Sequence, residues 1–282
     1  MPLSATLKQA IVGTPLEGPA RAVYRRLQRW SGGVGVQDDG PAHDTSSVPP
    51  EELATSAPDA NATYDAQTAE VIARVLARDS NCVDVGCHEG AVLDDILRHA
   101  PDGLHFAFEP LPYLAERLRA KYRDTASVRL HELALSDRGA QSITFHHVTS
   151  NPGYSGFEKR RYDRPSEDVT QIQVTTARLD DELPPELPIA LIKIDVEGAE
   201  LQVLRGGRET LRRWQPVVVF EHGLGAADVY GSRPEVLFDE LQACGLRVSL
   251  MADWLAGRPD LTRAAFADEF DTARNYYFMA HS

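Results

Sequence analysis

The chain has 282 residues, of which 43% are hydrophobic and 25% are charged. These proportions are those of an ordinary globular protein with one large core. The formal net charge of −13 argues against a nucleic-acid-binding protein, which would carry a basic face, and favours a small molecule or a glycan as partner.

No stretch approaches 18 consecutive apolar residues, and residues 1–30 contain no continuous apolar region. We therefore expect neither a transmembrane segment nor a secretory signal. The three cysteines are an odd number with no C-x-x-C pair, which excludes the common zinc spacings and fits a reducing compartment. These features together predict a cytoplasmic protein.

The first part of the chain has the pattern of an appendage. In residues 16–30 apolar residues recur at helical spacing beside a cluster of arginines, which predicts an amphipathic basic helix within residues 1–30. Such a helix could dock on the core, form a homodimer, or meet a membrane surface or an acidic partner. Residues 31–63 are rich in Gly, Pro, Ser, Asp and Ala, which predicts a flexible linker before a main domain at residues 64–282.

The most informative segment is 81–90, where an apolar run reaches Asp84 and a glycine-spaced loop follows. Gly86 allows a tight turn, and Gly90 allows a ligand or the next helix to approach the backbone. This pattern predicts a site for a nucleotide-type cofactor. His88 stands where a dinucleotide-binding G-x-G-x-x-G motif has its middle glycine, so an NAD-dependent oxidoreductase is a less favoured alternative.

A second acid follows the next strand-like run. The strand-like run at 104–108 is followed by Glu109, about twenty residues after the loop. A doubly wound sheet places the carboxylate that binds a ribose at this position. Two ribose hydroxyls are donors that a carboxylate accepts well. We therefore assign Glu109 to the cofactor site, and His88 could also approach the ligand from the loop.

From residue 64 onward, helix-like and strand-like patterns alternate, which predicts a parallel sheet with helices on both faces. The first helix is expected over residues 66–77, and the last two strands at 246–250 and 276–279. Between 141 and 176 the alternation stops, and strand-like runs at 143–145 and 172–174 flank a long connection. A loop of this length in a compact domain is usually functional, so we expect a lid or substrate loop at about 148–170.

The later strands also end in candidate groups. Asp195 follows one strand-like run, and Glu221 and His222 follow the next. Ligands of open α/β sheets bind at the carboxyl ends of the strands, so we expect these three residues to be catalytic. His222 has the pKa range of a base, and Asp195 could orient it, act as a base, or hydrogen-bond a substrate.

The same three side chains could instead bind a divalent cation such as Mg²⁺. Lys193 points to the same side of its strand as Asp195 and could be a buried partner of one of the acids. Glu197 is expected to cap the helix that follows.

Several motifs together resemble the FkbM family of S-adenosylmethionine-dependent methyltransferases, over about residues 64–224. They are Asp84-Val-Gly-Cys-His-Glu-Gly90, Ala107-Phe-Glu-Pro110, Ala134-Leu-Ser-Asp137, Gly153-Tyr-Ser-Gly-Phe157 and Lys193-Ile-Asp-Val-Glu-Gly-Ala-Glu200. The resemblance implies a Rossmann-like class I methyltransferase fold, with a mostly parallel seven-stranded sheet, helices on both faces and an antiparallel last strand. It also places Ala134 against the adenine.

The expected activity is O-methyl transfer from S-adenosylmethionine to a hydroxyl of a sugar or of a glycosylated or polyketide natural product. The expected cofactor-binding residues are Asp84, Gly86, His88, Gly90, Glu109 and Ala134, and the expected acceptor-binding residues are Tyr154, Ser155, Phe157 and Lys193. A non-catalytic adaptor that docks through the basic N-terminal helix is a third interpretation.

Overall fold

The computed structural model describes residues 60–161 and 167–282. The chain divides into two units, Met1–Ala66 and Gln67–Ser282, and the described part of the first unit belongs to helix α3 (Ala60–Val75). The predicted basic helix, and with it any dimer contact, lies outside the described residues. Helix α3 begins before the expected position, residue 66, so that its first four residues overlap the predicted linker, 31–63. The linker was inferred from composition, and residues 60–63 contain neither Gly nor Pro to stop a helix.

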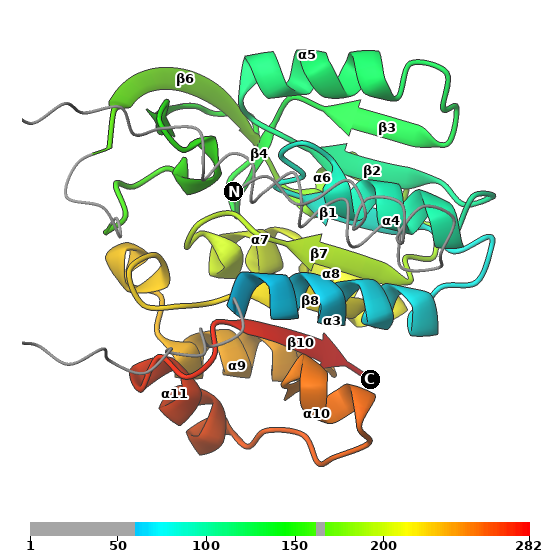
Figure 1. Ribbon diagram of the computed structural model, residues 1–282, viewed down its shortest axis with the longest axis vertical. Coiled ribbons are helices and arrows are strands. Elements are labelled where there is room, and N and C mark those ends of the chain that lie inside the picture. The colour runs from blue at the N-terminus through cyan, green and yellow to red at the C-terminus, as the bar shows by residue number, and fades with distance from the viewer. Residues whose placement is uncertain (1–59, 162–166) are drawn as a thin grey trace, which may run out of the picture. The chain divides into compact units, whose positions relative to one another are not determined.

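A seven-stranded sheet forms the centre of the second unit, with the order β3-β2-β1-β7-β8-β10-β9 (Figure 1). The strands are β3 (Val128–His131), β2 (His105–Phe108), β1 (Cys82–Val85), β7 (Leu191–Ile194), β8 (Val217–Glu221), β10 (Tyr277–His281) and β9 (Arg247–Ser249). The first five run parallel, and β10 is antiparallel to both of its neighbours. This order confirms the predicted class I methyltransferase fold, including the antiparallel last strand.

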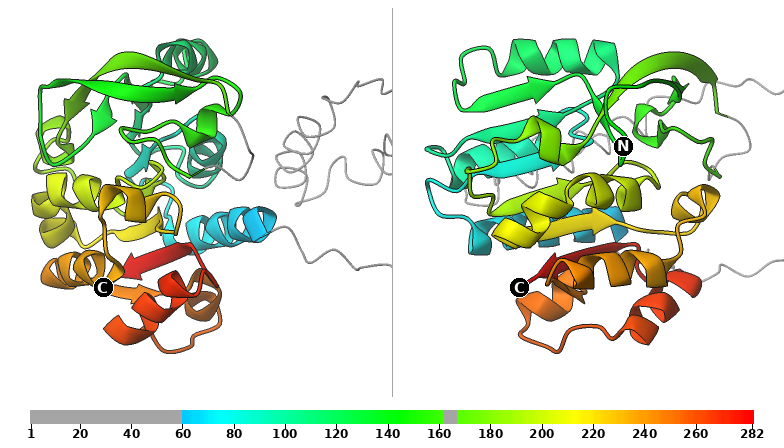
Figure 2. Two further views of the ribbon diagram at one scale, coloured as in Figure 1. Left: turned by 90° about the vertical axis from the view of Figure 1, so that its left-hand side faces the viewer. Right: turned by 180° about the vertical axis from the view of Figure 1, so that it is seen from behind.

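The central strands form because their residues are buried on both faces. All residues of β1, β2 and β7 are buried, as expected for parallel strands with nearly continuous apolar sequences. Helices α4 (Ala91–His99) and α5 (Pro112–Lys121) lie on one side of the sheet. Helices α7 (Glu200–Gly206), α8 (Arg208–Trp214) and α9 (Pro234–Ala243) lie on the other (Figure 2).

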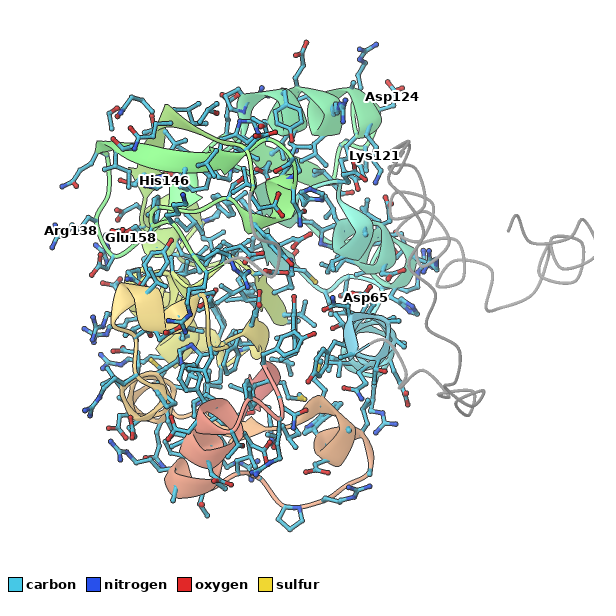
Figure 3. The ribbon with its side chains drawn as sticks, turned by 60° about the vertical axis from the view of Figure 1, so that its left-hand side comes forward. Asp65, Lys121, Asp124, Arg138, His146 and Glu158 are labelled. Atoms are coloured by element: carbon cyan, nitrogen blue, oxygen red, sulfur yellow. The ribbon has the colours of Figure 1, made fainter. Side chains whose placement is uncertain are left out.

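A second, smaller sheet interrupts the alternation, with the order β4-β6-β5. Strands β5 (Ser142–Val148) and β6 (Val169–Ala177) pair antiparallel, which confirms the two strands predicted around 143–145 and 172–174 and extends both. Strand β4 (Ala134–Leu135) pairs with the end of β6. After β5 the chain forms a 3₁₀ turn, η1 (Pro152–Tyr154), and then folds back on β5, where His146 bridges to Gly156. Figure 3 shows His146 and Glu158 on this side of the molecule.

The remaining elements complete the unit at its edges. They are α6 (Leu179–Glu182), η2 (Ala227–Tyr230), α10 (Met251–Leu255) and α11 (Arg263–Asp271). The part of α3 that belongs to the second unit contacts α10, because the hydroxyl of Thr68 donates a hydrogen bond to the sulfur of Met251. Among the described residues, none of the helices combines the length and the apolar character that a membrane span requires.

Candidate functional site

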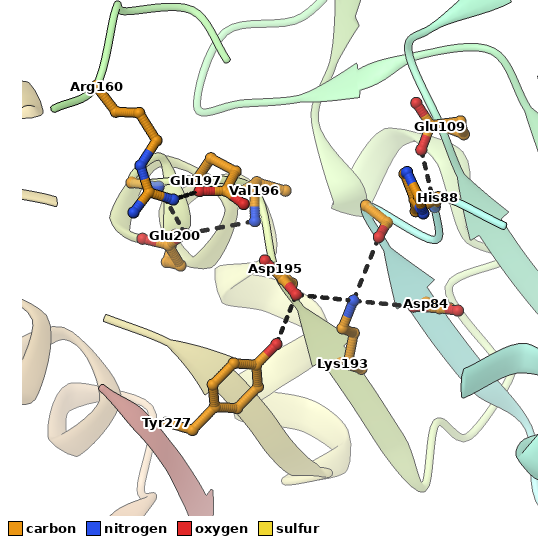
Figure 4. A network of polar contacts seen from close by, with 12 residues as sticks. Asp84, His88, Glu109, Arg160, Lys193, Asp195, Val196, Glu197, Glu200 and Tyr277 are labelled. Carbon is orange, nitrogen blue, oxygen red and sulfur yellow. Dashed lines mark hydrogen bonds and ion pairs between the residues drawn. The ribbon is translucent and has the colours of Figure 1, made fainter. Parts of the chain in front are cut away.

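Acidic side chains gather at the carboxyl ends of β1, β2, β7 and β8, and Figure 4 shows those of Asp84, Glu109 and Asp195. Asp84 lies within β1 and Glu109 directly follows β2, while Asp195 follows β7 and Glu221 ends β8. Because these strands are parallel neighbours, their ends lie at the same edge of the sheet. The structure therefore brings together the strand-end acids that the sequence predicted, as the rule for open α/β sheets requires.

The loop after β1 has no room for side chains at its two glycines. Gly86 has φ +73°, and a Cβ there would lie 1.9 Å from the carbonyl oxygen of Asp195. Gly90 has φ +77°, and a Cβ would lie 2.4 Å from the hydroxyl oxygen of Tyr122. Between them His88 also adopts a left-handed conformation, with φ +49°. The glycines are thus needed both for the turn and for close approach of the backbone to neighbouring segments.

Glu109 holds this loop from the next strand. Its Oε2 accepts a hydrogen bond from the backbone N–H of His88 at 2.9 Å, and its Oε1 accepts one from the N–H of Leu111 at 2.9 Å. Burial raises the pKa of Glu109 to about 7, although these two hydrogen bonds oppose that change. Each carboxylate oxygen keeps a further lone pair, so the arrangement fits a ligand that offers two hydroxyl donors.

Asp84 and Lys193 form a buried ion pair beneath the loop. Asp84 is fully buried, and its Oδ1 lies 3.8 Å from the Nζ of Lys193. Lys193 also lies 3.5 Å from Asp195 Oδ2 and donates a hydrogen bond to the carbonyl oxygen of Gly86 at 3.2 Å. The side chain of Lys193 is 8% exposed, which identifies it as the buried partner of two acids.

Asp195 and Glu221 form a hydrogen-bonded carboxyl pair at the ends of β7 and β8. Burial raises the pKa of Glu221 well above its ordinary value, and the neighbouring charge of Asp195 raises it further. Burial alone would also raise the pKa of Asp195. The charge of Lys193 and hydrogen bonds from Glu221 and Tyr277 outweigh burial and lower the pKa of Asp195 to about 2. The two carboxyl groups therefore differ in acidity, with Asp195 the stronger acid of the pair.

Glu197 joins this pair in place of His222. Carboxylate oxygens of Asp195, Glu197 and Glu221 lie within 4.8 Å of one another, so these three are the residues that could hold a metal ion among those the structure describes. The guanidinium group of Arg160, from the long loop, forms an ion pair with Glu197. Two cations, Lys193 and Arg160, thus lie against the acidic group.

Glu197 does not cap the following helix, contrary to expectation. Helix α7 begins at Glu200, and Glu197 precedes it with a left-handed φ of +59°. Glu200 instead fixes the turn before α7, because its Oε1 accepts hydrogen bonds from the backbone N–H of Gly198 at 2.9 Å and of Val196 at 3.4 Å. Burial raises the pKa of Glu200 to about 7.

His222 lies in the core, which corrects its assignment as a catalytic base and metal ligand. Its ring stacks on Phe270 at 4.8 Å and on Phe266 at 5.9 Å between centroids. Neither ring nitrogen has a hydrogen-bond partner among the described residues, and the side chain is fully buried. Burial lowers the pKa of His222 to about 3. An imidazole enclosed by apolar rings stays neutral and cannot reach a substrate.

The expected acceptor-binding residues lie on the loop after β5, with different surroundings. Tyr154 carries the Arg160 guanidinium over its ring, with 4.5 Å between that group and the ring centroid. Ser155 is buried, and its Oγ accepts a hydrogen bond from the N–H of Val148 at 3.0 Å. Phe157 packs edge-on against Phe145. Tyr154 therefore lies on the side of Arg160 and the acidic group, whereas Ser155 and Phe157 hold the loop to β5 and the smaller sheet.

Two residues of the site were not predicted from the sequence. Arg160 belongs to a charged loop segment that contains other arginines, and Tyr277 lies in the last strand beside another tyrosine. Their partners, Glu197 and Asp195, are 37 and 82 residues away along the chain. No local pattern indicates such distant pairs. Ala134, the expected adenine contact, is buried in β4 and packs with Leu111 and Leu114.

Comparison with known proteins gives the family. The model of the methyltransferase FkbM domain matches residues 84–248. The 2-O-methyltransferase NoeI of Sinorhizobium fredii is 32% identical over 162 residues, covering 51% of this chain and 64% of that relative. The chain thus spans slightly less than two thirds of the length of the curated relative that it matches.

Solved structures of methyltransferases are more distant. The methyltransferase FkbM from Methylobacillus flagellatus has a TM-score of 0.46 and 13% identity, with 73% of this chain and 44% of that chain covered. Fibrillarin from Aeropyrum pernix, in complex with S-adenosyl-L-methionine, has a TM-score of 0.41 and 14% identity, with 77% and 76% covered. The family match carries the assignment, because it extends over more than half of the chain and contains the glycine loop and the strand-end acids. This chain belongs to the methyltransferase FkbM domain family.

Proposed function

We propose that the protein transfers the methyl group of S-adenosylmethionine to a hydroxyl oxygen of a sugar or of a glycosylated or polyketide natural product. The observation that carries this proposal is the juxtaposition of two different carboxyl sites at one sheet edge. Glu109 braces the glycine loop, and the Asp195–Glu221 pair lies two and three strands away. One site suits a ribose, and the other suits a neutral hydroxyl donor.

The cofactor half of the site uses the loop at 86–90 and Glu109. S-adenosylmethionine would supply an electrophilic methyl group on a sulfonium. The described residues fit such a ligand, because Glu109 can accept from ribose hydroxyls, and the loop glycines let its backbone come close to a ligand. Ala134 and His88 complete the proposed cofactor contacts.

The acceptor half uses Asp195, with Tyr154 contributed by the loop after β5. Methyl transfer forms a carbon–oxygen bond as the carbon–sulfur bond breaks, and the hydroxyl proton leaves to solvent. A carboxylate with a pKa of about 2 is a weak base. We therefore assign Asp195 to alignment of the acceptor hydroxyl by a hydrogen bond, and Glu221 to fixing Asp195.

The proposed reaction needs no divalent cation at the acidic group. Lys193 and Arg160 already provide two positive charges next to Asp195 and Glu197, and burial raises the pKa of Glu221 well above its ordinary value. A dication would have to displace Arg160 or add to a group whose charge is balanced. Binding measurements with and without magnesium test this point directly.

O-methylation is supported by the relative's name, whereas the carbohydrate acceptor is part of our proposal. The matched relative is a 2-O-methyltransferase, and it is 32% identical. A sugar offers several neutral hydroxyls, which suits a site where charges on the protein are already paired.

Isothermal titration tests which cofactor the protein binds. The ligands are S-adenosylmethionine, S-adenosylhomocysteine and NAD, each with and without magnesium. We expect saturable binding of the first two ligands and none of NAD. Glu109→Gln should weaken both by about tenfold, since a hydrogen bond to a charged group is lost or weakened. Asp195→Asn should leave both affinities unchanged. Binding of NAD in place of S-adenosylmethionine would contradict the proposal.

A panel of hydroxylated sugars with S-adenosylmethionine labelled on its methyl group then identifies the acceptor. We expect label in a methyl ether, and Asp195→Asn should lower turnover by about tenfold, because the charged hydrogen-bond acceptor that aligns the hydroxyl is lost. Label transferred to a carboxyl or amine group would contradict the choice of a hydroxyl acceptor.

A further inference from the structure

Lys193 is a buried cation surrounded by oxygen atoms from three segments (Figure 4). Its Nζ lies 3.8 Å from Asp84 Oδ1, 3.5 Å from Asp195 Oδ2 and 3.2 Å from the carbonyl oxygen of Gly86. The register of β1 and β7 places Lys193 directly opposite Asp84. A single ammonium group therefore joins β1, the glycine loop and the end of β7.

Neutralising a buried acid does not account for all of these contacts. Asp84 is fully buried, and neither of its carboxylate oxygens has a hydrogen-bond partner of normal geometry among the described residues. A carboxyl group in this environment requires a counter-charge, which Lys193 supplies. Lys193 also donates a hydrogen bond to the neutral carbonyl of Gly86, which charge neutralisation does not require. This bond fixes the backbone of the loop rather than the charge of Asp84.

The position of Gly86 matters because the loop passes directly against the end of β7. A Cβ at Gly86 would lie 1.9 Å from the carbonyl oxygen of Asp195. Any displacement of Gly86 therefore moves the glycine loop relative to Asp195. Lys193 contacts both segments: the glycine loop at the carbonyl oxygen of Gly86, and the end of β7 at the carboxylate of Asp195.

We infer that Lys193 is a positioning residue that holds the glycine loop in its cofactor-binding shape and in register with the acceptor-aligning carboxylate of Asp195. The inference rests on the proposed function, because it takes the loop at 86–90 as the cofactor site. A charged donor in a water-excluded position restrains its acceptors more strongly than an exposed one does. Lys193 thus acts beneath the site rather than on the acceptor, which refines its expected role as a substrate contact.

The test compares Lys193→Met with Leu241→Ala in the full-length chain. Lys193→Met removes the ammonium group and keeps an apolar stem of similar length. Leu241 is fully buried in α9, and its truncation lowers the melting temperature without touching the loop. We expect both variants to melt earlier. Lys193→Met should bind S-adenosylhomocysteine about tenfold or more weakly, since a charge-assisted hydrogen bond to the loop is lost, whereas Leu241→Ala should keep the wild-type affinity.

The double variant Asp84→Asn/Lys193→Met distinguishes two roles of Lys193: positioning of the glycine loop and neutralisation of the charge on Asp84. If Lys193 only neutralised Asp84, the double variant would recover both the melting temperature and the affinity, and the inference would be wrong. Recovery of the melting temperature with the affinity still reduced would support it. Wild-type affinity in Lys193→Met would also overturn it. If the wild-type protein bound neither S-adenosylmethionine nor S-adenosylhomocysteine, the proposed function would be wrong. The inference, which depends on it, would then be wrong as well.

Discussion

The hydroxyl of Tyr277 donates a hydrogen bond to Oδ2 of Asp195, with 2.5 Å between the two oxygens. Lys193 lies 3.5 Å from the same carboxylate oxygen. Tyr277 belongs to β10, where it pairs with Glu221 in the strand register. The antiparallel strand thus supplies a donor to an acid on a parallel strand. Two donors at Oδ2 stabilise the ionised carboxylate and fix its orientation, as alignment of a hydroxyl requires.

Tyr277→Phe should therefore reduce methyl transfer without weakening cofactor binding. Loss of one hydrogen bond to a charged group corresponds to about a tenfold lower kcat. The pKa of Asp195 should also rise, which moves the acidic limb of the pH–rate profile to higher pH. Turnover of labelled S-adenosylmethionine with the identified acceptor measures both effects. Tyr113→Phe, which removes a hydroxyl from α5, is the control and should leave the profile unchanged.

His222→Leu should keep both activity and fold. The imidazole packs between Phe266 and Phe270, and its nitrogens make no hydrogen bond with the described residues, so a leucine of similar volume loses little. We expect a stability cost below about 1.5 kcal/mol, typical of volume-conserving core substitutions. Thermal unfolding and the labelled-methyl assay measure the two quantities. A loss of turnover in a well-folded His222→Leu protein would restore His222 as a catalytic candidate.

Arg160→Met should weaken acceptor binding. The substitution removes the ion pair with Glu197 and the cation–π contact with Tyr154, which together hold the loop after β5 at the acidic group. We expect the KM for the acceptor to rise by about fivefold to tenfold, because a partly buried charge pair is lost, with the affinity for S-adenosylhomocysteine unchanged. Steady-state kinetics and titration separate the two effects.

Arg161→Met is the matched control for that experiment. Arg161 pairs with Asp228, but its side chain is 64% exposed, and surface ion pairs contribute about 0–1 kcal/mol. The KM of Arg161→Met should stay close to the wild-type value. Equal effects of the two substitutions would mean that the loop responds to its total charge rather than to the contact with Glu197.

Glu200 should make the fold less stable as the pH rises from about 4.5 to about 7. Its pKa is raised by burial from 4.5 to about 7 in the folded chain, so the folded state binds the proton more tightly than the unfolded state does. The stabilisation is complete below the unfolded pKa and is lost as the pH rises through the folded pKa. The slope from this one group approaches about −1.4 kcal/mol per pH unit.

Glu200→Gln should remove that slope, because the amide does not titrate. Denaturant unfolding of both proteins at several pH values between 5 and 8 measures the difference. The stability difference between wild type and variant should shift in favour of Glu200→Gln as the pH increases. Parallel curves across this range would show that Glu200 has the same pKa in the folded and unfolded states.

The sequence predicted the parts of the site that depend on local pattern. A buried apolar run followed by an acid identifies a strand end, and parallel strand ends share one edge, so Asp84, Glu109, Asp195 and Glu221 were placed correctly. The glycine loop was also recognisable, because positive φ and a close backbone approach leave few residue types. Each of these signals can be seen within a short stretch of sequence.

The remaining features depend on contacts that no local pattern contains. His222 occupies a strand end like the acids, but α11 supplies two aromatic rings that enclose it. Glu197 and Glu200 lie in the same acidic segment, but only Glu200 accepts hydrogen bonds from the turn before α7, whereas Glu197 pairs with Arg160. The partner of Glu197 comes from another loop. These outcomes follow from tertiary packing.

The place of β10 between β8 and β9 sets the order in which the sheet can be completed. During synthesis, β8 exposes an unpaired edge until residues 277–281 leave the ribosome, and such an edge can pair with other chains. Asp195 is made early but receives the donor Tyr277 at the end. Deletion of residues 277–281 would therefore remove both the strand that covers the edge of β8 and the hydrogen-bond donor to Asp195, although neither belongs to a recognisable motif.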